Sequence, residues 1–447
     1  MEYCVDGDGN WKTLSSNTNT ESINKGQTLS FRGNLTPASS AGVGIFKISK
    51  SCDLTGNCNS LLFGDDAVNN NSLSGKNYAF YKLFYNCSTI KNVSSNFLPA
   101  TTLANYCYYR MFERCSKLTT APELPATTLA SSCYRNMFYD CTSLTIAPKL
   151  PATTLANYCY DSMFYSCRSL TTAPQLPATT LANKCYNYMF WGCSKLTTAP
   201  ELPATTLASS CYRNMFYECT SLTTAPELPA TTLASNCYDS MFERCSKLTT
   251  APELPATTLA SSCYHSMFSG TNVLPDCSNI NFSSSTVVAS GGLQGLFAGT
   301  KVTDDDLRNI LPINSNGKYY LPCTTLANSC YDSMFTDCTS LTTAPALPAT
   351  TLASYCYRSM FNYCTSLTIA PELPAKTLVS NCYYYMFYRC SKLNYIKAMF
   401  TTTPSSSYTY GWVHAVASSG TFVKNKNATW NVTGPDGIPS GWTVQTT

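Results

Sequence analysis

The sequence has 447 residues, of which 44% are hydrophobic and only 12% are charged, about half of the usual charged share. Its net charge is +4, from 29 basic and 25 acidic residues without a block of like charge. This balance argues against nucleic-acid binding, which needs clustered Lys and Arg. The chain has two histidines, His265 and His414, so few residues are available for histidine-based catalysis or for a histidine-rich metal site. Composition therefore disfavours an enzyme.

The start of the chain and its hydrophobic stretches bear on where the protein resides. The N-terminal MEYCVDGDGN lacks the basic start and apolar run of a secretory signal. No stretch approaches the roughly 18 to 20 apolar residues of a membrane-spanning helix. We therefore expect no direct membrane insertion. Two explanations for the missing signal stay open: the protein is displayed without a cleaved signal, as on a virion, or its N-terminus has been trimmed.

One repeat fills most of the chain. The dipeptide Cys-Tyr recurs every 26 residues from Cys107 to Cys263, and again from Cys330 to Cys382. The shared unit reads CYxxMFxxC[ST]xLTxAPxLPATTLAxx, and weaker copies around Cys87 and Phe297 bring the array to about 12 units. A fixed period of this length is typical of a solenoid.

The residues within a unit predict its local structure. In SSCYRNMFYDC, Cys133, Met137 and Cys141 stand at i, i+4 and i+8, which predicts the apolar stripe of a short helix. The following LTIAPKLPATTL carries prolines and Thr pairs, which predict an extended segment with one very short strand and turns. A strand and a short helix in a 26-residue unit fall within the leucine-rich-repeat range. The predicted fold class is an α/β repeat solenoid.

The array is irregular over residues 269–322. Thr271 and Thr300 stand where the second Cys of the unit should be, and the spacing between units lengthens. Extra residues in a solenoid unit usually loop out on one face. Residues 303–311 (TDDDLRNIL) predict a short helix with Thr303 as its N-cap. Regular repeats are therefore expected over residues 76–268 and 323–394, with an insertion between them.

The repeat resembles the BspA-like leucine-rich repeat, the Bacteroides surface protein A type. That family's unit has a Cys, a Leu three residues on, a strand ending in Pro, and a short helix closing with an aromatic residue and the next Cys. The matching positions are Cys141, Leu144, Pro151, Leu155, Cys159, Met163, Phe164 and Cys167. The family's Ala-Phe is Met-Phe here, except at Ala79-Phe80. The resemblance spans residues 78–393 and implies a leucine-rich-repeat array.

The flanks also resemble those of such proteins. Residues 1–75 are similar to the β-rich leader that precedes these arrays, and Cys52 and Cys58 in it either pair or stay free. Residues 395–447 are similar to the closing module. There, Trp412, Val413 and Val416 predict an apolar helical edge. Gly420 would end that helix, and Phe422, Trp430 and Trp442 would cover the last unit. A solenoid needs such a cap, because a bare terminal unit exposes its core face.

The cysteines allow three arrangements. As helix residues, Cys133 and Cys141 would lie roughly 12 Å apart along the axis, whereas a disulfide needs Cα atoms within about 7 Å. Each Cys recurs once per unit, which favours a ladder of small buried thiols. Disulfides between repeats and zinc binding are the alternatives, although no CxxC occurs. The odd total of 25 cysteines excludes full pairing within one chain.

Sequence motifs for catalysis are absent. The chain has no GxxxxGK[ST], HExxH, GxSxG or GxGxxG, and a cysteine nucleophile would need a histidine partner. His265 occupies a slot that other units fill with Arg, Asp, Asn or Tyr, so it is predicted to be a solvated helix residue. His414 is predicted to pack in the cap or to face water. We predict a non-enzymatic protein without cofactor or metal.

The positions that vary between units are the candidates for ligand binding. They follow Met-Phe and Cys-Tyr, and both sets are expected on the outer, helical face. Aromatic rings beside Asp, Asn and Arg suit a sugar or a protein partner. The candidate ligand-binding residues are Tyr139, Tyr165, Trp191, Tyr217, Tyr109, Arg135, Asp161, Tyr188 and Arg213. The alternative is that these tyrosines merely cover the helices and bind no ligand.

Two functions fit these features. The favoured one is adhesion, in which the solenoid binds a surface glycan or protein and is displayed outside the cell, on a bacterial envelope or a phage particle. The alternative is a purely structural fibre or decoration protein, a spacer that contacts neighbouring virion or envelope proteins. An enzyme with a site in residues 269–322 is a distant third. Neither nucleic acid nor a membrane is an expected partner.

Overall fold

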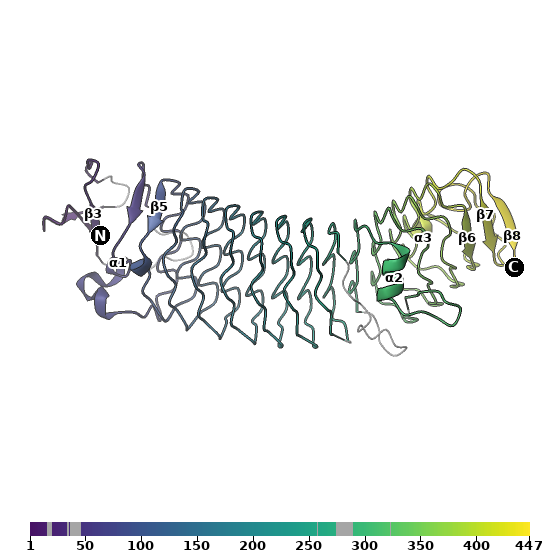
Figure 1. Cartoon of the computed structure of the whole chain (residues 1–447), viewed down its shortest axis with the longest axis horizontal. Coiled ribbons are helices and arrows are strands. Elements are labelled where there is room, and N and C mark those ends of the chain that lie inside the picture. The colour runs from purple at the N-terminus through teal and green to yellow at the C-terminus, as the bar shows by residue number, and fades with distance from the viewer. Residues whose placement is uncertain (16–19, 34, 36–45, 257, 274–288, 322) are drawn as a thin grey trace. The chain divides into compact units, whose positions relative to one another are not determined.

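The computed structural model describes the chain except for residues 16–19, 34, 36–45, 257, 274–288 and 322 (Figure 1). The chain divides into two compact units, Met1–Pro203 and Ala204–Thr447. In each of them, successive repeats lie side by side, and the chain ends carry most of the regular secondary structure (Figure 1).

The first unit begins with two small sheets. Strands β1 (Glu2–Val5), β2 (Lys12–Thr13) and β3 (Leu29–Arg32) form an antiparallel sheet in the order β2-β1-β3. Strand β4 (Cys52–Leu54) pairs in parallel with β5 (Ile90–Val93). The short helices are α1 (Ser60–Phe63), η1 (Gly64–Asn69) and η2 (Ser95–Phe97). The repeats follow from there.

The segment predicted to be helical in each repeat is not a helix, so that prediction is wrong. Residues 132–141 and their equivalents form a series of β-turns, here called the turn ribbon. Every fourth residue is left-handed, with φ of 55° at Ser132, 53° at Asn136 and 59° at Asp140. These are the positive φ values that a type II turn requires at its third position. The repeat is therefore built of an extended segment and turns, and the predicted helix is absent from its described residues.

The hydrogen bonds of the turn ribbon explain this geometry. Alternate N–H groups, those of Arg135 and Met137 among them, donate to the carbonyl three residues earlier in the same repeat. The N–H groups between them donate to the next repeat, as Tyr134 does to the carbonyl of Cys159 at 3.0 Å and Phe138 to that of Met163 at 3.0 Å. A helix would satisfy these donors within its own segment. The turn ribbon instead ties each repeat to its neighbour.

The extended half of the repeat contributes single-residue parallel bridges. In the first unit, Thr120, Ile146, Thr172 and Thr198 bridge successively, and a second column pairs Thr154 with Thr180. Prolines between the two columns, such as Pro148 and Pro151, keep these bridges from lengthening into strands, because proline cannot donate to a ladder. The threonine side chains of these columns are mostly exposed.

The core lies between the turn ribbon and the bridges. Cys133, Met137, Phe138, Cys141 and Leu144 are fully buried, and the same positions are buried throughout the array. The inside positions read from the Cys-Met-Cys stripe are therefore confirmed, although they sit on turns. Phenylalanine rings stack along the core with centroids 5.7 Å apart from Phe112 through Phe190.

The second unit contains the irregular region and the C-terminal end. Gly291, Gly295 and Gly299 take the left-handed positions of a turn ribbon, which identifies the weak copy around Phe297 as a repeat. Helix α2 (Asp304–Ile310) is capped by Thr303, as predicted, and Thr303 also forms a capping box with Asp306. Helix α3 is Ser406–Thr409, and β6 (Tyr395–Ala398), β7 (Thr421–Lys424) and β8 (Thr443–Thr446) form a parallel sheet.

The predicted helical edge at Trp412 to Val416 is also wrong. Gly411 and Ala415 have φ of 59° and 57°, spaced four residues apart. The N–H groups of Tyr385 and Phe387 donate to the carbonyls of Tyr410 and Trp412. Residues 410–415 are thus a further turn-ribbon segment that stacks on the Cys382 repeat.

None of the described cysteines forms a disulfide, Cys52 and Cys58 included. In most repeats the second Cys is buried and its thiol donates to the carbonyl of the Phe in the preceding repeat, as Cys141 does to Phe112 at 3.1 Å and Cys167 to Phe138 at 3.1 Å. Where Thr271 replaces this Cys, its hydroxyl donates to the Phe268 carbonyl of its own repeat at 2.7 Å. The thiols therefore form a ladder of small hydrogen-bonded groups. Cys277 lies outside the described residues.

This ladder predicts a pattern of thiol reactivity. Burial raises the pKa of Cys133 and Cys245 to about 12, so their thiolate fraction in the folded chain is negligible at pH 8. In native protein, alkylation of the described cysteines should be confined mainly to the half-buried Cys52. Denaturation without reductant should expose most thiols to the reagent. Disulfides in most repeats, detected by mass spectrometry of the unreduced protein, would contradict the ladder.

Candidate functional site

The structure places the nine candidate residues on the turn ribbons. Eight of them are half-buried: Tyr109, Arg135, Tyr139, Tyr165, Tyr188, Trp191, Arg213 and Tyr217. Asp161 is only 2% exposed, so its prediction as an outer-surface ligand-binding residue is wrong. The residue after Cys-Tyr is half-buried at Tyr109, Arg135 and Arg213 but buried at Asp161, and the residue after Met-Phe is half-buried at Tyr139, Tyr165, Trp191 and Tyr217.

Three of the predicted aromatic residues form a stacked row in the first unit. The rings of Tyr139 and Tyr165 are 4.5 Å apart between centroids and inclined by 7°. The rings of Tyr165 and Trp191 are 5.5 Å apart and inclined by 19°. Tyr188 packs against Trp191 at 5.3 Å with a tilt of 44°. We call Tyr139, Tyr165, Tyr188 and Trp191 the aromatic row.

Stacking determines what the aromatic row presents to solvent. Tyr139 covers one face of the Tyr165 ring and Trp191 covers the other. The row therefore offers ring edges and phenol hydroxyl groups rather than open ring faces. Such a ridge is apolar along its length and carries hydrogen-bonding groups at its rim, the combination that makes Tyr and Trp common at interfaces.

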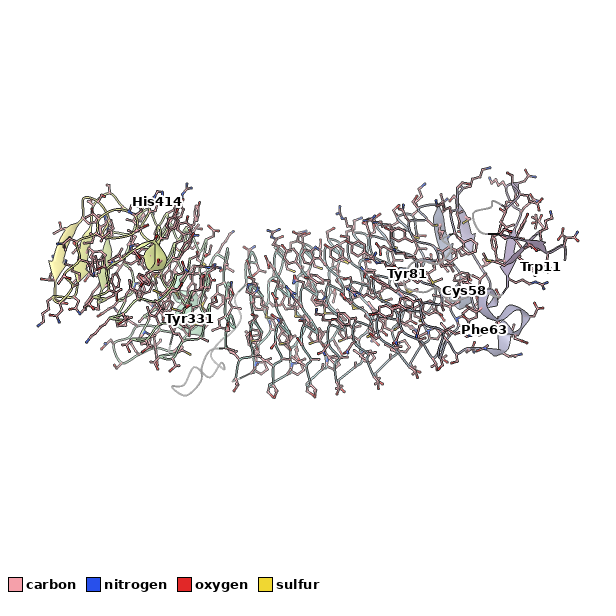
Figure 2. The ribbon with its side chains drawn as sticks, turned by 180° about the vertical axis from the view of Figure 1, so that it is seen from behind. Trp11, Cys58, Phe63, Tyr81, Tyr331 and His414 are labelled. Carbon is pink, nitrogen blue, oxygen red and sulfur yellow. The ribbon has the colours of Figure 1, made fainter. Side chains whose placement is uncertain are left out.

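The remaining aromatic candidates have other neighbours. Tyr109 stacks on Tyr81 at 5.2 Å between centroids, and Figure 2 labels Tyr81 within the first unit. The guanidinium of Arg135 lies 5.8 Å from the Tyr109 ring centroid. Tyr217 belongs to the second unit, where the Arg244 guanidinium lies 5.6 Å from its ring centroid.

Asp161 and its neighbours form a polar ladder between repeats. Its carboxylate lies 3.0 Å from Nε of Arg135 and accepts hydrogen bonds from Ser162 at 2.9 Å and Asn187 at 3.2 Å. Burial raises the pKa of Asp161, while Arg135 opposes that rise. Because all its partners come from adjacent repeats or its own, Asp161 joins repeats together rather than facing a ligand.

The second unit repeats this arrangement and corrects the prediction for His265. The Asp239 carboxylate lies 2.9 Å from Nε of Arg213 and 2.8 Å from Nδ1 of His265. His265 is therefore a half-buried partner of Asp239 on a turn ribbon, not a solvated helix residue. A third copy joins Asp332 to Arg358 at 2.8 Å and to Gln294 at 3.3 Å.

Sequence reasoning missed a cluster of aromatic side chains in the second unit. Tyr384, Tyr385 and Tyr388 come from one repeat, and Tyr410 and His414 come from the following turn-ribbon segment. Figure 2 shows His414 at the periphery of this unit, whereas Tyr331 lies within it. The available signal was the run CYYYMFYRC, which fills three of its four variable positions with tyrosine.

The irregular region contains a cleft of about 240 Å³. Its described lining includes Thr300, Lys301 and Asp306 but neither His nor Cys. The Asp306 carboxylate accepts hydrogen bonds from the N–H and the hydroxyl of Thr303, and the Thr300 hydroxyl donates to the Phe297 carbonyl. These groups are thus engaged in holding the local fold.

Metal binding and membrane insertion are two further properties that the described residues can be tested for. No group of three or more His, Cys, Asp or Glu side chains among them could hold a metal ion. Within the same residues, none of the helices has the length and apolar character needed to cross a membrane.

Comparison with known proteins identifies the repeat. The model of the BspA type leucine rich repeat region matches in 6 copies, over residues 81–197, 158–290 and 321–412. No curated protein matches the chain. Among solved structures, a leucine-rich repeat protein from Bacteroides ovatus is 15% identical, with a TM-score of 0.41 over 82% of this chain and 86% of that one. A TLR13–ssRNA13 complex is 12% identical, with a TM-score of 0.25 over 75% of this chain and 43% of that one.

The family match covers well over half of the 447 residues. It coincides with the segments in which the buried Cys, Met and Phe positions recur. The two structural similarities are too low to add to it. This chain belongs to the BspA-type leucine-rich-repeat family.

Proposed function

We propose that this protein is a non-enzymatic recognition protein whose turn ribbons bind a surface glycan or a surface protein. Proteins of this family are typically surface-associated and non-enzymatic. The observation that carries the proposal is the aromatic row, which is half-exposed and occupies positions that vary between otherwise uniform repeats. We further propose an extracellular location, on a bacterial envelope or a phage particle.

The geometry of the aromatic row favours an extended partner. Because the ring faces are stacked on one another, a single sugar ring has no open face to pack against in the middle of the row. A glycan chain or a flat protein surface that crosses several repeats can contact the ring edges and reach the phenol hydroxyl groups. Aromatic residues in such positions contribute a large share of binding energy at interfaces.

Binding of the full chain to glycan arrays and to arrays of surface proteins tests this proposal. Trp191→Ala should weaken binding to the ligand found by about tenfold or more, since interface hot spots are often tryptophans. Arg168→Gln is the matched control, because Arg168 is exposed on the same unit outside the aromatic row. A ligand whose affinity is the same for both variants and the wild type would refute a role for the aromatic row.

The second candidate is a structural spacer in a virion or envelope. It is favoured by the bridge columns, whose exposed threonines are nearly identical from repeat to repeat and offer no distinctive site. In this case the contacts would be with copies of the chain or with neighbouring particle proteins. Recovery of the protein only as a stoichiometric part of a purified particle, with no array ligand, would favour the spacer.

A further inference from the structure

The aromatic side chains at the end of the second unit form a surface separate from the aromatic row. We call Tyr363, Tyr384, Tyr385, Tyr388, Tyr410 and His414 the tyrosine cluster. Its members are half-buried or exposed, and Tyr410 is 42% exposed. His414 marks its position in Figure 2.

Some rings of the tyrosine cluster are stacked, Tyr384 on Tyr410 at 28° and Tyr388 on His414 at 17°, and others are tilted. Tyr384 and Tyr385 are inclined by 63°, and Tyr385 is inclined by 57° to Tyr388 and by 50° to Tyr410. Tyr410 stacks on Tyr384 but is 42% exposed, so part of its ring remains open to a ligand. The tyrosine cluster can therefore offer the Tyr410 ring to a ligand.

The backbone at Gly411 leaves room for the Tyr385 ring. Gly411 has φ of 59°, and a Cβ at this position would lie 2.5 Å from Cε1 of Tyr385. The Tyr385 ring thus lies directly against the Gly411 backbone. Loss of surrounding water, and then the adjacent Tyr384, raise the pKa of Tyr385 to about 12, so its phenol remains a neutral hydrogen-bond donor at physiological pH. The cluster is held in place rather than loosely exposed.

A guanidinium without an acidic partner lies at the edge of the cluster. Arg389 is exposed, and its guanidinium carbon lies 5.3 Å from the Tyr363 ring centroid and 5.5 Å from that of Tyr388. Within the described part of the chain it makes no ion pair, whereas Arg358 is paired with Asp332. The nearby Asp436 carboxylate accepts the Gly411 N–H at 2.6 Å. The surface therefore combines an exposed tyrosine ring, that of Tyr410, with positive charge.

We infer that the tyrosine cluster and Arg389 bind an acidic sugar, a pyranose that carries a carboxylate, within a glycan. A tyrosine face packs against the C–H groups of the sugar ring, and phenol hydroxyl groups bond to its hydroxyls. The planar guanidinium of Arg389 pairs with the sugar carboxylate through two parallel hydrogen bonds, as arginine does with carboxylates generally. This site is distinct from the aromatic row, and it stands whether or not the aromatic row binds a ligand.

Calorimetric titration of the full chain with an oligogalacturonate tests the inference. The matched probe is the same oligomer after reduction of its carboxyl groups to neutral alcohols. We expect the acidic oligomer to bind about tenfold or more tightly than the neutral one, because charge-assisted pairs are roughly twice as strong as neutral hydrogen bonds. Arg389→Gln should remove that preference, whereas Arg168→Gln, an exposed arginine outside the cluster, should keep it.

Two further variants separate the aromatic contribution from folding. Tyr410→Ala removes an exposed ring and should weaken binding of both oligomers while leaving the thermal midpoint nearly unchanged. Trp191→Ala should leave oligogalacturonate binding unchanged, which distinguishes this site from the aromatic row. The inference would be overturned if the wild type did not bind oligogalacturonate or bound the two oligomers equally. It would also be overturned if Arg168→Gln and Arg389→Gln reduced the affinity for oligogalacturonate equally.

Discussion

Deletion of residues 408–447 should make the protein aggregate. The deletion removes Trp412, which is fully buried and whose ring lies 6.2 Å from those of both Tyr383 and Phe387 in the Cys382 repeat. It also removes the carbonyls that accept the N–H groups of Tyr385 and Phe387. A terminal repeat left bare exposes apolar surface and unpaired backbone donors, and terminal solenoid units require a cover for this reason.

Light scattering and size-exclusion chromatography of the truncated chain provide the measurement. A shorter deletion of residues 443–447 is the control, because it removes β8, whose side chains are all exposed, and keeps Trp412, Phe422 and Trp430. The control should stay soluble and monomeric. If the chain that ends at residue 407 is equally soluble and equally stable, the C-terminal segment is not a cap.

Met189→Ala should lower the free energy of unfolding by about 2 to 5 kcal/mol, the usual cost of truncating a large buried side chain. Met189 is fully buried between Cys185 and Cys193, which are also fully buried. The neighbouring repeats are joined to this one through the turn ribbon, since the N–H of Phe164 donates to the Met189 carbonyl at 3.0 Å. Solenoid repeats interact mainly with their neighbours, so exchange of amide hydrogens should rise around Cys185 first.

Tyr188→Ala is the matched control one residue away. Tyr188 is half-buried and left-handed, with φ of 55°, and alanine meets the same backbone restriction as tyrosine there. The change removes the ring contact with Trp191. It should lower the free energy of unfolding by roughly 1 kcal/mol, well below the loss expected for Met189→Ala. Hydrogen exchange and thermal unfolding of both variants provide the comparison. Equal destabilisation would mean that the inner and outer positions are misassigned.

The sequence predicts which residues of the repeat are buried but not the conformation of its backbone. Cys133, Met137 and Cys141 repeat every four residues, which fits both a helix of 3.6 residues per turn and a turn ribbon with a period of four. Over such a short segment the two periods place the same residues inside. The left-handed residues Ser132, Asn136 and Asp140 were the available signal for turns, because Asn and Asp tolerate positive φ better than most residues. Lys184 and Tyr188 hold equivalent positions and obscure that signal.

The candidate site is predictable only in part, and for a similar reason. Variation between repeats correctly located the outer edge of the turn ribbon, where Tyr139, Tyr165 and Trp191 stack. It could not show that Asp161 is buried, because the pairing with Arg135 depends on the side chain of the adjacent repeat. Nor could it show whether rings stack or tilt. Whether a pair stacks, as Tyr139 does on Tyr165, or tilts, as Tyr384 does against Tyr385, depends on how neighbouring side chains are placed in the folded chain.

The most direct test of the account measures ligand affinity and thermal stability together for Trp191→Ala and Met189→Ala. These residues are two apart in sequence, one on the outer edge and one in the core. For the surface ligand found on the arrays, Trp191→Ala should lower affinity by about tenfold or more, with only a small change in thermal midpoint. Met189→Ala should lower the midpoint and, below its unfolding temperature, retain most of the affinity. Loss of affinity in proportion to loss of stability in both variants would contradict a recognition surface on the aromatic row.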